Sequence, residues 1–314
     1  MSSSLLGLLL GTLSIPAATA HASTPGHDRS IWFWQSPDSP FGSLAILGNA
    51  AREDAAIARL KAWGVTTVYG SYSGSETPAV LRAWNRKLNS NGISSYLLMA
   101  DTEDLFPESW TAASARLKAN FVQFNRDSSP SERFGGVAFD IEPHIFPGSA
   151  RHGGWKASEP LIRRQYMADL LQFFQRTRAL LDENGEVGAH IEGTLPVWFA
   201  KLSGSIQWND AIDRDGWFAQ LSKACDRISL MAFEVPSPAT IVQRSDEEGN
   251  LLHGKARIAL RANLGNEWHS LKDFWAAAHA VEEETHQSID IQDFARLASE
   301  SEADKSATEV PAAQ

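Results

Sequence analysis

The sequence contains one cysteine, Cys225, and a lone thiol excludes both an internal disulfide and a cysteine-based metal site. Basic residues are also few, because 28 Lys and Arg stand against 38 Asp and Glu, for a net charge of −10. This balance leaves no basic stripe for a nucleic-acid partner and disfavours an anionic membrane surface. A neutral or cationic substrate fits such an acidic chain better.

Long hydrophobic runs are missing too, and the clearest apolar stretch lies at the start of the chain. Residues 5–15 are too few to cross a bilayer as a helix, but they suit the apolar region of a signal peptide. Small-residue cleavage patterns follow at residues 18–20 and 20–22, although no Lys or Arg precedes the stretch. We expect residues 1–22 to be a signal peptide and the mature protein to be secreted or periplasmic, with no membrane partner.

Internal repeats and shifts of composition are absent between residues 23 and 298, which predicts one domain there. Residues 299–314 are acidic, rich in small residues and without periodicity, so we expect a disordered tail. The domain length of about 270 residues is typical of one α/β barrel.

Short apolar runs alternate with helical patterns along this domain. The eight predicted strands are residues 31–35, 65–70, 93–99, 136–142, 187–193, 228–233, 256–262 and 288–291. The six clearest helical patterns are residues 50–63, 78–90, 109–126, 159–183, 213–224 and 271–284. Eight such alternations predict the α/β class and a (β/α)8 TIM barrel. An open doubly wound sheet is the alternative, but the first strand–helix turn lacks a Gly-rich phosphate loop.

The fourth predicted strand carries two carboxylates on one face. Alternation along the strand turns Val137, Phe139 and Ile141 toward the helices. Asp140 and Glu142 then face the barrel axis at the carboxyl end, where barrel enzymes carry their chemistry. Residues at this spacing lie roughly 7 Å apart, so in a dry pocket one carboxyl keeps its proton while the other ionises. A protonated carboxyl beside an ionised one suits general acid catalysis at a glycosidic oxygen. The alternatives are a salt-bridged strand end and a metal site.

Two motifs resemble those of family 18 glycoside hydrolases, the chitinases and their relatives. Residues 135–143, GGVAFDIEP, are similar to the fourth-strand motif of that family, and residues 228–234, ISLMAFE, resemble its sixth-strand motif. The resemblance implies a barrel glycosidase with Asp140 as helper carboxylate and Glu142 as general acid. It also places Met231, Phe233 and Glu234 at the substrate.

The chain departs from the family pattern in ways that bear on mechanism. Phe233 replaces a tyrosine whose hydroxyl holds the substrate acetamido oxygen in the family, and Ala138 replaces an upstream aspartate. A hydroxyl from Tyr69 or Tyr72 substitutes only if it reaches the same spot. We therefore expect activity that does not depend strictly on a 2-acetamido group. Glu142 would then work with another carboxylate, and the candidates are Glu234 first and Glu192 second.

Other residues near the predicted strand ends are candidates for substrate binding. They are Trp34, Tyr69, Tyr72, Asp101, His144, Glu192 and Trp198. Core packing is the alternative for each aromatic residue, and capping of the next helix is the alternative for Asp101. The Gly-rich loop of residues 144–158 is a candidate lid.

The sequence thus favours a glycoside hydrolase acting on a poly- or oligosaccharide, as a monomer without cofactor or metal. A non-catalytic carbohydrate-binding barrel that has lost catalytic residues is the main alternative. A metal-dependent phosphodiesterase barrel is a third, and it would need His and acidic ligands on several strands.

Overall fold

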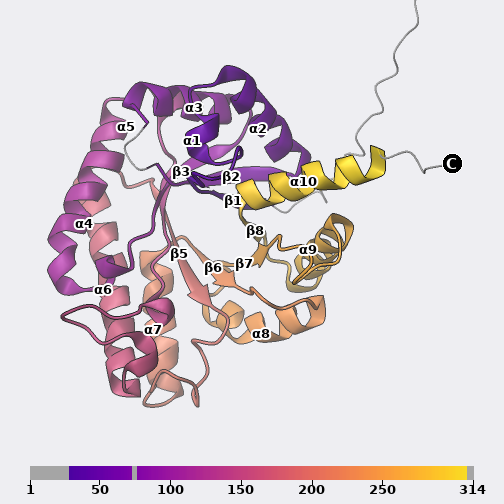
Figure 1. Ribbon diagram of the computed structural model, residues 1–314. Coiled ribbons are helices and arrows are strands. Elements are labelled where there is room, and N and C mark those ends of the chain that lie inside the picture. Colours follow the sequence, from indigo (N-terminus) through magenta and orange to yellow (C-terminus); the bar gives the residue numbers. More distant parts are fainter. Residues whose placement is uncertain (1–27, 73–75, 310–314) are drawn as a thin grey trace, which may run out of the picture.

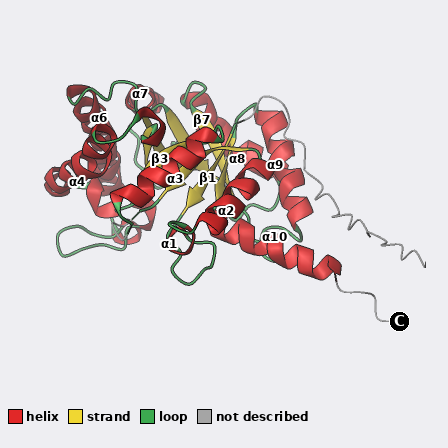
Figure 2. Ribbon diagram, turned by 90° about the horizontal axis from the view of Figure 1, so that it is seen from above, coloured by secondary structure: helices red, strands yellow, loops and turns green. Residues whose placement is uncertain are grey.

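Eight parallel strands form a closed barrel in chain order, with β8 pairing back onto β1. The computed structural model describes residues 28–72 and 76–309, so the predicted signal peptide lies outside the described residues. The prediction of a single-domain (β/α)8 barrel is confirmed. The open-sheet alternative is wrong because the β1–β8 pairing closes the sheet. Figure 1 shows the helices around the strands, and Figure 2 shows the same arrangement from above.

Each predicted apolar run overlaps one strand. The strands are Arg29–Phe33 (β1), Val65–Gly70 (β2), Ser94–Met99 (β3), Gly136–Phe139 (β4), His190–Pro196 (β5), Arg227–Met231 (β6), Ala256–Arg261 (β7) and Ile289–Gln292 (β8). The fourth strand ends at Phe139 rather than at residue 142, because Pro143 begins a short 3-10 turn at Pro143–Ile145. The fifth begins three residues later than predicted, because residues 185–188 turn between the preceding helix and the strand.

The helices pack outside the strands. They are Ser43–Ile46 (α1), Ala50–Ala62 (α2), Pro78–Ser90 (α3), Trp110–Leu117 (α4), Phe124–Arg126 (α5), Pro160–Glu183 (α6), Ala211–Ala224 (α7), Pro238–Leu251 (α8), Leu271–Thr285 (α9) and Phe294–Glu309 (α10). A π-helical stretch, Lys118–Gln123, joins α4 to α5 within the predicted helix of residues 109–126. In the described part of the chain, no helix combines the length and apolar character that crossing a membrane requires.

The last helix, α10, corrects one expectation from the sequence. Residues 299–309, predicted as part of a disordered tail, continue α10 beyond the boundary expected at residue 298. Phe294, Leu297 and Ala298 are buried, so the first turns of the helix are anchored on the barrel. Propagation adds one backbone hydrogen bond per residue once a turn is formed, and this carries the helix through acidic residues that lack an apolar period. In Figure 1, α10 extends away from the barrel.

Apolar side chains form two layers separated by the strands. The outer cluster lies between strands and helices and contains Val137, Phe139 and Ile141. The smaller inner cluster fills the barrel and contains Trp32, Tyr69, Tyr96, Leu98, Ala138, Met231 and Ala259. The side chains of β4 therefore divide between the two layers as strand alternation predicts, which fixes the face on which Asp140 and Glu142 lie.

Candidate functional site

Asp140 and Glu142 directly follow β4 at the carboxyl end of the barrel. The Asp140 N–H donates to Met99 O at 2.9 Å, which keeps this backbone beside β3 one residue past the end of β4. Ile141 between the two acids is buried in the outer layer, so the acids lie on the opposite, inner side. The barrel thus presents two carboxyl groups together at the end where barrel enzymes place their chemistry.

Asp140 is held by a hydrogen bond from the neighbouring strand. The Thr194 hydroxyl on β5 donates to Asp140 Oδ1 at 2.9 Å. Burial raises the pKa of Asp140 to about 6, while the Thr194 hydrogen bond opposes that rise because it stabilises the carboxylate. Asp140 is therefore mainly anionic at pH 7.

Glu142 holds the proton of the pair. Its side chain is 21% exposed, and burial first and the charge of Asp140 second raise its pKa to about 8. Since two like charges in a partly dry site do not both ionise cheaply, the two carboxyls titrate as a coupled pair. Near pH 7 the pair therefore consists of one carboxylate, at Asp140, and one carboxylic acid, at Glu142.

A Thr194→Val variant tests this division of roles. Valine keeps the shape of the side chain but removes the donor, so the pKa of Asp140 should rise by on the order of one unit. Carbon-13 NMR of labelled aspartate carboxyls measures the shift. Thr66→Val is the matched control, because the Thr66 hydroxyl donates to Arg29 O near the start of β1. An Asp140 pKa that is the same in both variants would contradict the role of Thr194.

His144 follows the acid pair and contacts Glu142. Its Nε2 lies 3.4 Å from Glu142 Oε2, and burial lowers the pKa of His144 to about 4, so the ring is neutral at pH 7. Trp198 and Phe199 from the β5–α7 loop meet the ring nearly at right angles, with centroid distances of 5.7 and 5.9 Å. Trp198, predicted as a sugar-stacking surface, thus forms part of the wall that holds His144.

The loop of residues 144–158 is anchored at several points. Trp155 is buried and stacks on Phe199 at 5.7 Å, and its N–H donates to Phe146 O at 3.0 Å. The Tyr166 hydroxyl on α6 donates to Gly153 O at 2.6 Å. The structure therefore makes this loop a packed wall of the site, in place of the lid suggested by its glycines.

Glu192 and Tyr69, both predicted at the substrate, lie instead inside the barrel. Glu192 is buried and shares a hydrogen bond of 2.9 Å with Ser229 Oγ, and Tyr69 is fully buried beside Trp32 and Tyr96. Burial, together with the charge of Asp290, raises the pKa of Glu192 to about 8. Strand alternation predicted the inner face for both residues but not their depth along the barrel, which the structure places below the mouth.

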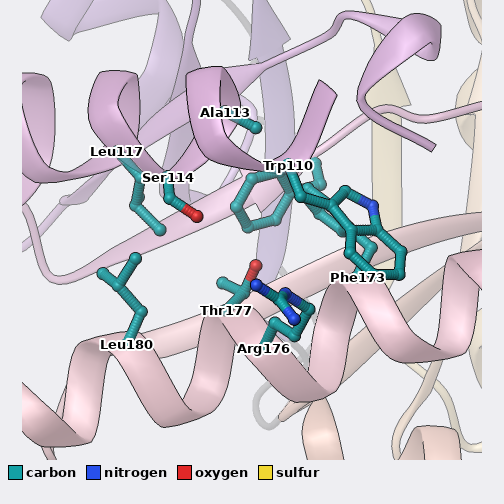
Figure 3. A pocket seen from close by; sticks show the side chains of 9 residues that line it. Trp110, Ala113, Ser114, Leu117, Phe173, Arg176, Thr177 and Leu180 are labelled. Atoms are coloured by element: carbon teal, nitrogen blue, oxygen red, sulfur yellow. The ribbon is translucent and has the colours of Figure 1, made fainter. Parts of the chain in front are cut away.

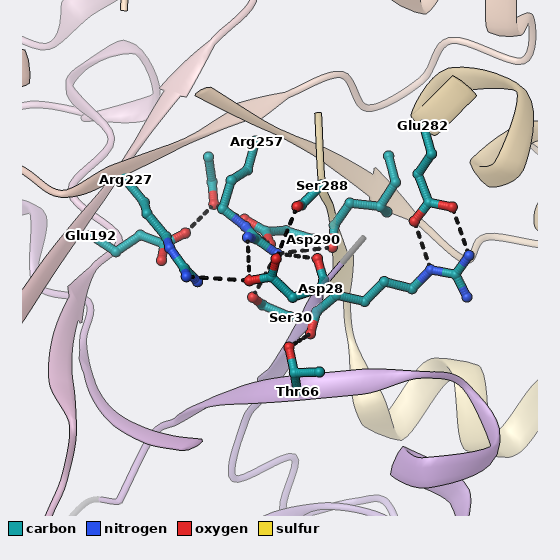
Figure 4. A network of polar contacts seen from close by, with 12 residues as sticks. Asp28, Ser30, Thr66, Glu192, Arg227, Arg257, Glu282, Ser288 and Asp290 are labelled. Carbon is teal, nitrogen blue, oxygen red and sulfur yellow. Dashed lines mark hydrogen bonds and ion pairs between the residues drawn. The ribbon is translucent and has the colours of Figure 1, made fainter. Parts of the chain in front are cut away.

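Glu192 belongs to a polar network in the amino-terminal half of the barrel (Figure 4). Ser229 Oγ also donates to Asp290, and Arg257 Nε donates to the same carboxylate at 2.6 Å. Arg257 further donates to Ser30 Oγ at 2.9 Å. The Arg257 guanidinium and the Ser229 hydroxyl are thus the partners of these buried acids, which is a structural use of the residues.

Two other predicted binding residues also have local structural partners. The Tyr72 hydroxyl accepts a hydrogen bond from Trp84 Nε1 at 3.0 Å, and its ring packs against the outer cluster, so Tyr72 points into the helix layer. Asp101 caps the 3-10 turn Thr102–Leu105 through a hydrogen bond from Glu103 N at 3.1 Å. Tyr72 is thus packed away from the inner face on which the acids lie, and the capping alternative describes Asp101.

The residues of the predicted sixth-strand motif lie in two different surroundings, the inner cluster and the solvent. Met231 and Phe233 pack with the inner cluster, as does Trp34 from the end of β1. Glu234 has φ +61° in the turn after β6, and its side chain is 82% exposed. It makes an ion pair of 3.5 Å with Arg261, whose guanidinium also lies over the Phe233 ring. Among the described residues no contact joins Glu234 to Asp140 or Glu142, so the structure does not bring this predicted second carboxylate to the acid.

Sequence reasoning missed Thr194, Phe199 and Arg261. Thr194 shares the inner face of β5 with Glu192, two residues closer to the carboxyl end, so alternation and position together were the signal for it. Arg261 ends β7 and donates to Glu267 Oε1 through Nε at 2.8 Å. Nothing in the local sequence pattern pointed to Phe199, because its contact with His144 joins residues far apart in the chain.

Two hollows lie away from the carboxylates. A hollow of about 10 Å³ lies between α4 and α6 beside Trp110 and Arg176 (Figure 3). It has room for about one water molecule and is a packing gap. A larger one, about 570 Å³, opens at the amino-terminal end of the barrel beside Asp28, Arg227 and Arg257. That end of a barrel contributes to stability rather than catalysis.

No set of three or more His, Cys, Asp or Glu side chains is arranged to hold a metal ion within residues 28–72 and 76–309. Cys225 is buried at the end of α7, in the outer cluster.

No family model matches the sequence, and no curated protein matches it either. Among solved structures, the chain is similar to the PgaB (BpsB) glycoside hydrolase domain from Bordetella bronchiseptica, with a TM-score of 0.56 at 9% identity over 89% of this chain and 98% of that one. It is also similar to a chitinase from Rhizomucor miehei, with a TM-score of 0.54 at 10% identity over 86% and 95% of the two chains.

A third similar structure is an exo-beta-1,4-mannosidase from Opitutaceae bacterium strain TAV5, with a TM-score of 0.57 at 11% identity over 85% of this chain and 51% of that one. The distant structural matches are mostly glycoside hydrolases. At these identities the likeness shows the TIM-barrel fold alone, and function has to be argued from the site.

Proposed function

We propose that the protein is a glycoside hydrolase with a carbohydrate substrate, in which Glu142 is the general acid and Asp140 the helper carboxylate. One observation carries the proposal. At the carboxyl end of the barrel, burial and the neighbouring Asp140 charge keep Glu142 protonated near pH 7, while Thr194 favours the anionic form of Asp140. A proton donor beside a fixed negative charge is the arrangement that cleavage of a glycosidic bond uses.

The chemistry follows from these two groups. Glu142 transfers its proton to the glycosidic oxygen as the bond to the anomeric carbon breaks. A water molecule then adds to that carbon and returns a proton to the Glu142 carboxylate. Positive charge develops on the sugar ring during bond breaking. The Asp140 carboxylate stabilises this charge electrostatically, and it does so more strongly in a buried site than in water.

The surroundings of the other carboxylates support Asp140 as the partner of the acid. Glu192 lies in the interior network, and the Glu234 side chain is 82% exposed. Neither Tyr69 nor Tyr72 is a candidate to replace the missing hydroxyl of Phe233, because Tyr69 is fully buried inside the barrel and the Tyr72 hydroxyl accepts a hydrogen bond from Trp84 in the helix layer. Asp140 is thus the carboxylate that remains beside the acid.

We expect matched N-acetylated and non-acetylated oligosaccharides to be cleaved with kcat/KM values within about tenfold. Phe233 has no hydroxyl to hold the acetamido oxygen, and the loss of such a donor typically lowers kcat by on the order of 10²–10³-fold. An acetamido group on the substrate should therefore give little increase in rate. One purified sample assayed on both series measures the ratio. Cleavage confined to the acetylated series, together with inhibition by a thiazoline transition-state mimic, would restore a substrate-assisted mechanism.

The second candidate function is carbohydrate binding without catalysis. The exposed Glu234 and the sequestered Glu192 favour it, because each leaves the acid pair without a further carboxylate. Fluorogenic glycosides and soluble polysaccharides separate the two functions, since a binding protein is stabilised by its glycan in a thermal-shift assay but releases no product.

A further inference from the structure

His144 is close enough to Glu142 to control how that residue holds its proton. The His144 Nε2 to Glu142 Oε2 distance is 3.4 Å, and both side chains are largely buried, at 17% and 21% exposed. A slight rotation of the carboxyl group brings the two atoms into hydrogen-bond range, and such contacts commonly tighten when substrate binds.

The His144 ring has little freedom to turn away. Trp198 and Phe199 meet it at interplanar angles of 88° and 90°, and Trp155 in turn stacks on Phe199. Packing of this kind fixes both the position of the ring and the nitrogen that it presents to Glu142.

The two ring nitrogens differ in their surroundings. Nδ1 is buried, and within the described residues it has no hydrogen-bond partner, whereas Nε2 faces Glu142. A buried N–H without an acceptor costs more than a bare lone pair, so the proton of the neutral ring belongs on Nε2. Nε2 is then a donor, and Glu142 Oε2 is its acceptor.

We propose that His144 is a positioning residue for Glu142: its Nε2–H donates to Oε2 and thereby keeps the acid proton on Oε1. This inference rests on the proposed function for its catalytic meaning. When Oε1 releases its proton to the glycosidic oxygen, the same N–H stabilises the carboxylate that forms, as a charge-assisted hydrogen bond. The charged or titratable groups facing Glu142 are then Asp140, which opposes ionisation, and His144, which favours it.

Two substitutions at position 144 separate donation from packing. His144→Phe keeps an aromatic ring but removes the donor, so kcat should fall roughly tenfold to a hundredfold with little change in KM. The pKa of Glu142 should also rise, because its carboxylate loses a stabilising donor, and the alkaline limb of the kcat profile should move to higher pH. His144→Gln retains an N–H donor and should keep kcat within a few-fold of the wild type.

His152→Phe is the matched control in the same loop. His152 Nε2 pairs with Glu108 at 2.5 Å, and its ring stacks on Phe106, so the variant perturbs the loop without touching Glu142. Its kcat and pH profile should match those of the wild type. Equal losses in the Phe variants at positions 144 and 152 would show that only loop packing matters and would overturn the proposal.

Nitrogen-15 NMR of the unmodified protein tests the pair without any substrate. At pH 7 we expect a protonated Nε2 and an unprotonated Nδ1 for His144. A protonated Nδ1 would overturn the proposal even in an active enzyme. If no glycoside is cleaved but the Nε2–H form is found, the proposed hydrolase activity fails while the His144–Glu142 pairing stands.

Discussion

Replacing Glu142 by glutamine is expected to lower kcat by roughly 10²–10⁴-fold, the usual contribution of a general acid. Glutamine keeps the size and hydrogen-bonding capacity of the side chain but has no proton to transfer. Binding should largely survive, so glycan-induced stabilisation in a thermal-shift assay should stay close to that of the wild type. Steady-state kinetics on fluorogenic glycosides measures the loss.

The control for this variant is Glu183→Gln, which makes the same chemical change on an exposed side chain at the end of α6. It should leave kcat unchanged. Activity of Glu142→Gln within a few-fold of the wild type would remove Glu142 from the acid role. Glycan stabilisation with no turnover in the wild type would instead support the carbohydrate-binding alternative.

Asp140→Asn provides a second test at the same site. Asparagine removes the negative charge that raises the Glu142 pKa, so that pKa should fall. Glu142 is needed in its protonated form, and the alkaline limb of the activity profile should therefore move to lower pH. Activity should also fall, because the developing positive charge on the sugar loses its neighbouring carboxylate.

Arg257→Met is expected to reduce the free energy of unfolding by about 3–5 kcal/mol, the usual cost of removing one partner of a buried ion pair. The Arg257 side chain is 4% exposed and that of Asp290 is fully buried, at a distance of 2.6 Å. Without the guanidinium, both Asp290 and Glu192 remain in the barrel interior with the single Ser229 hydroxyl between them. Urea denaturation at pH 7 measures the change.

Arg86→Met is the surface control, because its pairing with Glu132 involves an arginine that is 60% exposed. Exposed pairs contribute roughly 0–1 kcal/mol, so this variant should be close to the wild type. A double variant, Arg257→Met with Asp290→Asn, should recover part of the lost unfolding free energy, because it no longer buries an unpaired Asp290 charge. Equal small effects of the two single arginine variants would mean that the interior network contributes little to stability.

Some elements were predictable and others were not, for identifiable reasons. The strands were visible because their apolar runs are bounded by glycine and polar turns, and α3 was predicted with its observed ends at residues 78 and 90. Helix α8 was missed because Pro238–Leu251 is largely polar and follows a Pro-rich turn. In α10, tertiary contacts at Phe294 and Leu297 outweigh the weak periodicity of the following acidic residues.

For the candidate site, the sequence by itself determined that Asp140 and Glu142 share one face at the end of a barrel strand, because a strand alternates with a period of two. It did not determine how deep in the barrel each side chain lies, or which residues from other strands and loops contact it. Only the tertiary structure showed that Thr194 hydrogen-bonds to Asp140 and that His144 packs against Trp198 and Phe199. It also showed that Glu192 and Tyr69 are buried inside the barrel. Those contacts join residues tens of positions apart, and local periodicity carries no information about which strand or loop lies opposite.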